Sequence, residues 1–143
     1  MIKGVKIFEY EKYSDKRGWL NEVWRSDVID FQPGMGYISM TLPGKSRGPH
    51  EHRKQTDYFI FMGTSEFLVK LWDGKKSVED RIIAAEGKIT IIMVPPGIIH
   101  GYKNTGRSNG LVLNMPDKLY GGKNRKHAVD EIRHEESGRY IMD

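Results

Sequence analysis

The sequence predicts an all-β fold of the sandwich or barrel type, and three observations favour this class. Short segments rich in β-branched or aromatic residues recur along the chain, and such segments are typical of strands. Turn signals that contain Gly, Pro or Asp separate these segments at the intervals expected in a sandwich or barrel. Helix signals are weak, since only residues 26–29 and 129–135 have a pattern that could form a helical turn.

The expected strands can be placed in chain order. In the clearest one, Phe67, Val69 and Leu71 alternate with Leu68 and Lys70, which is the period of two of a half-buried strand. The other expected strands cover residues 5–8, 19–24, 36–42, 58–62, 89–94 and 111–115, and one more begins at residue 100. The turns between them lie at residues 15–18, 43–44, 62–63, 73–74, 95–97 and 105–106.

Length and charge limit the domain organisation and the partners. The 143 residues suffice for one compact domain and are too few for two of ordinary size, so we expect a single domain over residues 1–143. The 23 Lys and Arg against 19 Asp and Glu give a net charge of +4, and the two signs are mixed along most of the chain. This mixture does not favour nucleic acid as a partner. The basic segment at residues 123–127 is expected to be a solvated loop, with phosphate contact as the alternative.

The sequence also predicts a cytoplasmic protein without a membrane span. The longest apolar stretch, residues 89–99, is interrupted by Pro95, Pro96 and Gly97, and it is shorter than the roughly 20 residues that a membrane-spanning helix needs. The first residues lack the apolar core of a signal peptide, and the chain contains no Cys for disulfides.

Three of the five histidines lie in two unusual settings. His50 and His52 flank Glu51 in an extended segment, where residues two apart share a face, so both rings are expected to project the same way. If that face is inward, two imidazoles line one cavity. His100 follows the turn at residues 95–97 and opens a strand.

These two settings resemble the two sequence motifs of the cupin superfamily. The residues that match are Gly44, His50, His52, Gly63, Pro95, Gly97, His100 and Asn104. The resemblance implies a cupin fold, which is a double-stranded β-helix or jelly-roll barrel.

Within the cupins, two groups of sugar enzymes are similar to this chain. Residues 15–22, 39–44 and 47–50 resemble the dTDP-4-dehydrorhamnose 3,5-epimerase family, and residues 47–52 resemble the dTDP-sugar 3,4-ketoisomerases. Both resemblances imply an isomerase or epimerase that removes a proton next to the ketone of a nucleotide-linked (dTDP) 4-keto-6-deoxysugar. They place it in deoxysugar or polysaccharide biosynthesis and imply no cofactor and no metal.

The resemblance also implies the catalytic residues. His50 would be the base that removes the proton beside the 4-keto group, and His titrates close enough to neutral pH for this task. His52 would be its proton partner, as in the ketoisomerases. Tyr102 lies two residues after His100 and is the alternative partner.

The substrate-binding residues come from the same resemblance. Arg47 and His100 would hold the sugar and its developing enolate. Arg17 and Glu22 would contact the nucleotide, in this family often from a neighbouring subunit, and Arg is suited to a diphosphate because it offers paired donors. A homodimer is therefore expected, since small barrels of this kind pair by exchanging N-terminal strands.

The chain departs from the epimerase pattern at three points. The position of the family's Tyr acid matches Leu113, and that of a Lys matches Thr56. The C-terminal segment that supplies an Asp to orient the base is expected to be missing, because the chain stops at Asp143. These losses favour an alternative function, a binding module that retains the sugar pocket without turnover.

A metal-dependent cupin is the other alternative. His50, His52, Asp57 and His100 have the composition of a site for Fe, Mn, Ni or Zn. However, Asp57 lies one residue after the usual acidic position, and a shift of one residue reverses the face of a strand side chain. Asp57 is therefore expected to point away from the histidines.

Overall fold

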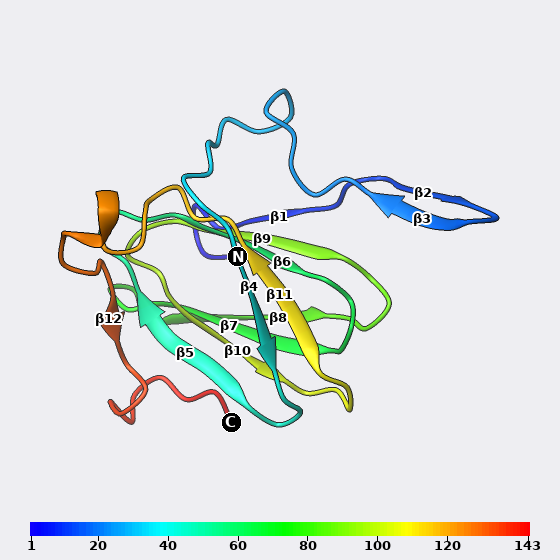
Figure 1. The fold of residues 1–143 in the computed structure, drawn as a ribbon. Helices are drawn as coiled ribbons and strands as arrows, with labels where there is room; N and C mark the ends of the chain where they lie inside the picture. The colour runs from blue at the N-terminus through cyan, green and yellow to red at the C-terminus, as the bar shows by residue number, and fades with distance from the viewer.

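The computed structural model describes residues 1–143 and confirms the all-β prediction (Figure 1). One five-stranded antiparallel sheet has the order β1-β9-β6-β11-β4, the other has the order β12-β5-β10-β7-β8, and β2 and β3 form a separate hairpin. The strands are β1 Lys6–Phe8, β2 Lys12–Asp15, β3 Gly18–Asn21, β4 Tyr37–Thr41, β5 Ser46–Glu51, β6 Asp57–Phe61, β7 Phe67–Asp73, β8 Val78–Ala84, β9 Thr90–Val94, β10 Ile99–Asn104, β11 Gly110–Asn114 and β12 Ile132–Arg133.

The main core fills the space between the two sheets. Phe59 and Phe61 of β6 belong to the same buried cluster as Val69 and Leu71 of β7 and Tyr102 of β10. Residues two apart on each strand contribute, as expected where one face of each sheet is turned inward. Full burial of one large apolar side chain contributes roughly 1.5 to 3 kcal/mol.

A second apolar layer covers the outer face of the β6-containing sheet. Tyr58 and Ile60 point outward from β6 and are nevertheless buried, because the segment that follows the hairpin packs over them. Phe31 stacks on Tyr58 with ring centroids 5.2 Å apart, and the Tyr58 hydroxyl donates to the carbonyl oxygen of Val23 at 2.8 Å. Strand β6 is therefore buried on both faces and forms a rigid support for Asp57 at its start.

The two expected helical turns are not helices. Residues 26–29 form a simple turn, and residues 129–135 contain β12, whose Ile132 and Arg133 pair with Glu51 and His50 of β5. The open edge of β5 offers unpaired backbone groups, and satisfying them outweighs a weak local helix preference. The only helical segment is a 3-10 turn at Lys123–Arg125, so no helix is long enough to cross a membrane.

Strand β7 differs from the half-buried pattern at Lys70. This side chain lies on the outward face but is only 2% exposed. The C-terminal segment covers it, and its Nζ donates to the carbonyl oxygen of Ile141 at 2.9 Å and to Asp143 Oδ1 at 2.5 Å. The burial of Lys70 therefore depends on a distant segment of the chain. The alternation of residues in β7 does not reveal this contact.

We predict that Gly110→Ala lowers the free energy of unfolding by about 1 to 3 kcal/mol, the usual cost of overpacking a core. A Cβ atom at Gly110 would lie 2.2 Å from Cζ of Phe67, which is itself buried. Urea unfolding measures the change. Gly36→Ala is the control, because its Cβ would meet no atom closer than 3.7 Å; equal losses in both variants would contradict this account.

Candidate active site

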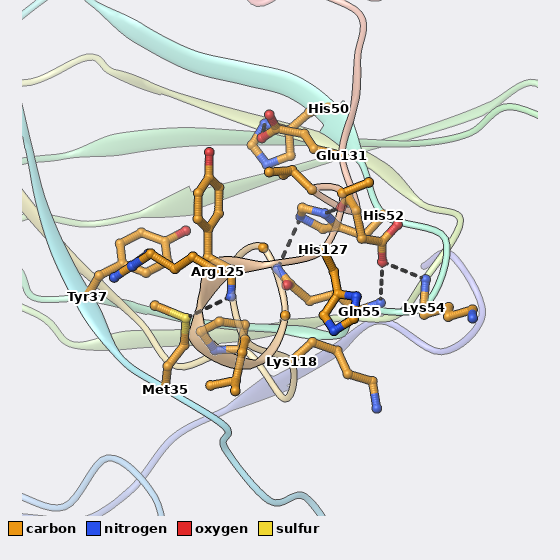
Figure 2. Close-up of a pocket in the computed structure, with 18 residues that line it drawn as sticks. Met35, Tyr37, His50, His52, Lys54, Gln55, Lys118, Arg125, His127 and Glu131 are labelled. Carbon is orange, nitrogen blue, oxygen red and sulfur yellow. Dashed lines mark hydrogen bonds and ion pairs between the residues drawn. The ribbon is translucent and has the colours of Figure 1, made fainter.

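A cavity of about 560 Å³ lies beside β5, with His50 and His52 in its lining (Figure 2). Three parts of the chain surround it, namely residues 35–37, 50–55 and 116–131. The first lies at the start of β4, the second at the end of β5 and in the turn that follows it, and the last in the segment after β11. The shared presence of His50 and His52 confirms that these two side chains project to the same side.

An irregularity in the pairing of β5 with β10 positions His50. His100 of β10 pairs with His50, but Tyr102 pairs with Arg47, so three steps along β5 match two along β10. Gly48 lies in this bulge with φ of +78°, and a Cβ there would be 2.7 Å from the carbonyl oxygen of His100. Only glycine fits such a close approach in this conformation. The ring centroids of His50 and His100 are consequently 4.6 Å apart.

Asp57 points toward the histidines, contrary to the sequence expectation. Its Oδ2 atom is 3.0 Å from Nε2 of His52 and 3.0 Å from Nε2 of His100. Residues 53–56 leave the extended conformation between β5 and β6, so strand alternation does not run on from His52 to Asp57. The turn at residues 53–56 compensates for the one-residue offset, so the Asp57 carboxylate faces inward.

The Asp57 carboxylate is fully engaged. Its Oδ1 accepts hydrogen bonds from Gln55 Nε2 at 2.8 Å and from Asn114 Nδ2 at 2.9 Å. Burial alone would raise the pKa of Asp57, but the close contacts with His100 and His52 and the charges of these rings outweigh burial and hold its pKa well below its usual range. Asp57 is therefore a buried anion with four polar neighbours.

The tautomers of two histidines follow from their Nδ1 partners. Nδ1 of His52 bonds to the carbonyl oxygen of Asp130, and Nδ1 of His100 bonds to that of Ile98 at 2.8 Å. A carbonyl oxygen only accepts, so Nδ1 carries the proton in both rings. Both Nε2 atoms are left to face Asp57. Nε2 of His100 is buried and lies outside hydrogen-bonding geometry, so it has no hydrogen-bond partner.

His52 and His50 have opposite tendencies to hold a proton. Burial lowers the pKa of His52, but the hydrogen bond and charge of Asp57, with a smaller contribution from Asp130, raise it to about 9. Burial lowers the pKa of His50 to about 3, and the charges of His100 and His52 act in the same direction. Neighbouring groups whose environments separate their pKa values in this way are suited to act as acid and base. At neutral pH His50 is free to accept a proton and His52 has one to give.

The C-terminal segment belongs to this site, which the sequence did not indicate. The Asp130 carboxylate accepts hydrogen bonds from the backbone N–H groups of Arg53, Lys54 and Gln55, at 2.8, 2.9 and 3.1 Å. This clamp places Glu131 beside His50, with its Oε1 atom 4.0 Å from Nδ1 of His50. The sequence expectation concerned an Asp of the C-terminal segment, and the carboxylate that lies near His50 is a Glu that the sequence analysis did not single out.

A second cavity of about 370 Å³ lies on the other side of His50 and contains Arg47 and Tyr102. The Tyr102 hydroxyl is 3.2 Å from Ser39 Oγ, and burial raises its pKa. Tyr37 lines both cavities. Its hydroxyl accepts a hydrogen bond from the buried Asn114 amide at 2.9 Å, and burial raises its pKa to about 12. Sequence reasoning missed Tyr37, although it lies two residues before Ser39 on the same face of β4.

The predicted substrate-binding residues are divided between two places. Arg47 lines the second cavity, where its guanidinium donates to Thr41 Oγ1 at 2.9 Å and to the carbonyl oxygen of Met40 at 2.8 Å. Arg17 and Glu22 lie on and just after the β2–β3 hairpin, and they line neither cavity beside His50. Within one chain the structure does not bring them to the histidines.

Leu113, which matches the family's Tyr position, packs in the outer apolar layer with Ile60 and its neighbours. Thr56, which matches the Lys position, lines neither cavity beside His50. These two departures from the epimerase pattern thus lie outside the candidate site.

The same cluster has the donor set of a metal site. One ligand atom from each of His50, His52, Asp57 and His100 lies within 4.8 Å of all the others. Two of the three rings are also held by backbone carbonyls through Nδ1, which is how ligating imidazoles are commonly oriented.

Comparison with known proteins agrees with this architecture. The model of the family FdtA, described as WxcM-like, C-terminal, matches residues 3–127. The chain is 32% identical over 127 residues to the "Probable low-salt glycan biosynthesis epimerase Agl13" of Haloferax volcanii, which covers 83% of this chain and 81% of that protein.

Solved structures share the fold. A dTDP sugar isomerase from Desulfovibrio desulfuricans superposes with a TM-score of 0.78 and 21% identity, over 92% of this chain and 84% of the other. QdtA, a sugar 3,4-ketoisomerase from Thermoanaerobacterium thermosaccharolyticum in complex with TDP, gives 0.75 and 17%, over 99% and 100% of the two chains. The predicted cupin fold is confirmed.

We predict that Asp57→Asn lowers the pKa of His52 from about 9 to its ordinary value of 6.5 or below, because burial then acts unopposed. NMR titration of the imidazole nitrogens measures this. Asp27→Asn, at an exposed carboxylate paired with Arg25, is the control and leaves His52 unchanged.

The same shift predicts a dependence of stability on pH. A pKa raised in the folded state stabilises the fold below the unfolded pKa, and this contribution is lost as pH rises through the folded pKa. The stabilisation from His52 is therefore complete below about pH 6.5 and disappears by about pH 9. Urea unfolding at pH 6 and 9 should show this loss in the wild type and a smaller one in Asp57→Asn.

Proposed function

The chain belongs to the FdtA family, described as WxcM-like, C-terminal, and from that premise we propose that it is an isomerase or epimerase of a nucleotide-linked 4-keto-6-deoxysugar. The proposed role is in deoxysugar or polysaccharide biosynthesis. The curated relative is named a glycan biosynthesis epimerase, and the structural neighbours are named sugar isomerases, one of them bound to TDP. The observation that carries the proposal is the His50 and His52 pair, whose rings line one cavity with their centroids 5.3 Å apart and whose pKa values are shifted in opposite directions.

The proposed reaction starts with removal of a carbon-bound proton next to the ketone. His50 accepts that proton, and the electron pair of the C–H bond passes into an enolate. Returning a proton to the opposite face of the same carbon gives epimerisation. Ketone migration results when the former ketone carbon receives the proton, the hydroxyl group on the deprotonated carbon loses its O–H proton to become the new ketone, and the former ketone oxygen takes up a proton to become a hydroxyl. His52 supplies this proton, and Asp57 stabilises its charged form.

The second cavity supports the remaining assignments. Arg47 lies there close to the base, so its free guanidinium nitrogen is placed to stabilise the enolate oxygen. His100 contributes through its contact with Asp57 and its packing against His50. Tyr102 faces the same cavity, and we retain it beside Tyr37 as a second proton partner.

Two exposed apolar surfaces support the proposal of a homodimer. The β2–β3 hairpin extends away from the sheets (Figure 1), and its Trp19 and Leu20 are 57% and 60% exposed. On the outer face of edge strand β4, Ile38 and Met40 lie opposite Leu113 and Leu111 and are exposed. Apolar surface of this kind marks an interface. A hairpin that crosses to a second copy would carry Arg17 and Glu22 to the nucleotide, as the family resemblance implies.

A metal-dependent cupin is the second candidate. The unpartnered Nε2 of His100 and the convergence of His50, His52 and Asp57 favour it. Fe, Mn, Ni or Zn would be held by these four residues. Elemental analysis of the purified protein decides between the candidates. A stoichiometric transition metal would show that the histidines bind a metal ion rather than transfer protons.

We predict that the wild-type protein exchanges the hydrogen beside the ketone of a dTDP-4-keto-6-deoxysugar for solvent deuterium, because deprotonation precedes both outcomes. His50→Asn should reduce exchange by about 10²-fold or more, the usual contribution of a general base. His52→Asn should reduce turnover more than exchange. NMR of the sugar measures both.

Exchange that persists unchanged in His50→Asn would rule out His50 as the base. Exchange abolished by a chelator would support the metal-dependent candidate. Absence of exchange with every 4-keto sugar nucleotide would leave the binding module.

We predict that sedimentation gives twice the chain mass of 16.5 kDa and that Met40→Glu shifts the protein toward the monomer, because a buried charge without a partner is costly. Val78→Glu is a matched control, since Val78 is 42% exposed against 44% for Met40 but lies on β8 of the other sheet. Dissociation by both variants, or a monomeric wild type, would contradict the proposed interface.

A further inference from the structure

Three cations line the cavity that contains His50 and His52. Lys54, Lys118 and Arg125 come from the turn after β5 and from the segment after β11 (Figure 2). None of the three forms an ion pair. Four other arginines do form ion pairs, as Arg17 does with Asp15 at 2.6 Å.

The acidic residues of the cavity do not neutralise these cations. The Asp130 carboxylate accepts hydrogen bonds from three backbone N–H groups. Burial is the largest influence on its pKa and would raise it, but these hydrogen bonds outweigh burial and lower the pKa. Glu131 accepts a hydrogen bond from Arg133 at 2.9 Å. The lining of the cavity thus holds three cations without an ion pair, beside the imidazoles of His50 and His52 and two carboxylates that are bound to other groups.

The loop that carries Arg125 is held in a specific shape. Asn124 and Arg125 have φ of 57° and 59°, in a region that side chains other than glycine rarely adopt. The N–H of His127 donates to the carbonyl oxygen of Gly121 at 2.7 Å and closes the loop. Arg125 lines the cavity, whereas Lys123 and Lys126 of the same loop do not. Residues 123–127 are exposed, as expected of a solvated basic loop, and Arg125 also lines the cavity.

We infer that Lys54, Lys118 and Arg125 bind the diphosphate of the substrate. The inference rests on the proposed function and specifies where its nucleotide part lies. The cavity has reactive imidazoles, an apolar wall that includes Met35, Leu119 and Val129, and cations at separate positions. A sugar nucleotide presents a keto sugar, a 6-deoxy carbon and a diphosphate in one molecule, and charged donors are the strong partners of phosphate oxygens.

Other cations are less suited to this role. The Arg47 guanidinium is bound to Thr41 and to the backbone of β4, and it lies in the second cavity. Arg17 lies on the projecting hairpin, outside the histidine cavity. Within the chain, the diphosphate therefore has its cationic partners in the turn at Lys54 and the segment after β11.

Calorimetric titration of the full chain with dTDP, dTMP and thymidine tests the inference. Lys54→Gln, Lys118→Gln and Arg125→Gln should each weaken dTDP binding roughly tenfold or more, the effect of losing one charged hydrogen bond. Thymidine binding should be unchanged. Lys123→Gln and Lys126→Gln are matched controls, because they remove the same charge from the same loop outside the cavity, and they should bind dTDP as the wild type does.

Wild-type dTDP affinity in all three cavity variants would overturn the inference, and equal losses in the two control variants would overturn it as well. Neither result affects the proposed proton chemistry, which deuterium exchange tests separately. If the wild type binds no dTDP, inorganic pyrophosphate is the probe. Binding that depends on the three cations then supports the anion site and places the failure in the proposed substrate, whereas no pyrophosphate binding overturns the inference.

Discussion

The candidate site depends on one buried carboxylate. Asp57 is 1% exposed, and a lone anion at such a depth would be strongly destabilising. Contacts of 3.0 Å to His52 and His100, together with two amide donors, make its burial possible. The contact with Asp57 raises the pKa of His52 against the effect of burial. The pKa of His50 is lowered mainly by burial and then by the charges of His100 and His52, which outweigh the opposite effect of Asp57.

Backbone pairing and hydrogen bonds to the backbone bring the side chains of the site together. The bulge at Gly48 brings His50 beside His100, and the carboxylate of Asp130 ties the C-terminal segment to the turn after His52. That tie orients the His52 ring through the Asp130 carbonyl oxygen. The segment after β11 is therefore part of the candidate site, since it completes the cavity wall, places Glu131 near His50 and carries Arg125.

The arrangement separates chemical tasks along the cavity. In the proposed mechanism, proton transfer belongs to His50 on β5 and His52 directly after it, whereas the residues assigned to the anion lie in a turn and a loop. Such a division is common, because strands fix reacting groups more accurately than loops and loops vary more readily to suit a ligand.

The sequence alone determined the fold class, the cupin resemblance and the pairing of His50 with His52, because each depends on local spacing: the period of two in strands and the intervals between Gly, Pro and His. It failed where distant segments meet. The inward direction of Asp57, the burial of Lys70, the strand at Ile132 and the contributions of Tyr37, Glu131 and Arg125 all depend on contacts between residues far apart in the chain. Alternation predicts a side chain's direction only while the strand continues, and at each of these positions the chain turns or receives a partner that only the tertiary structure supplies.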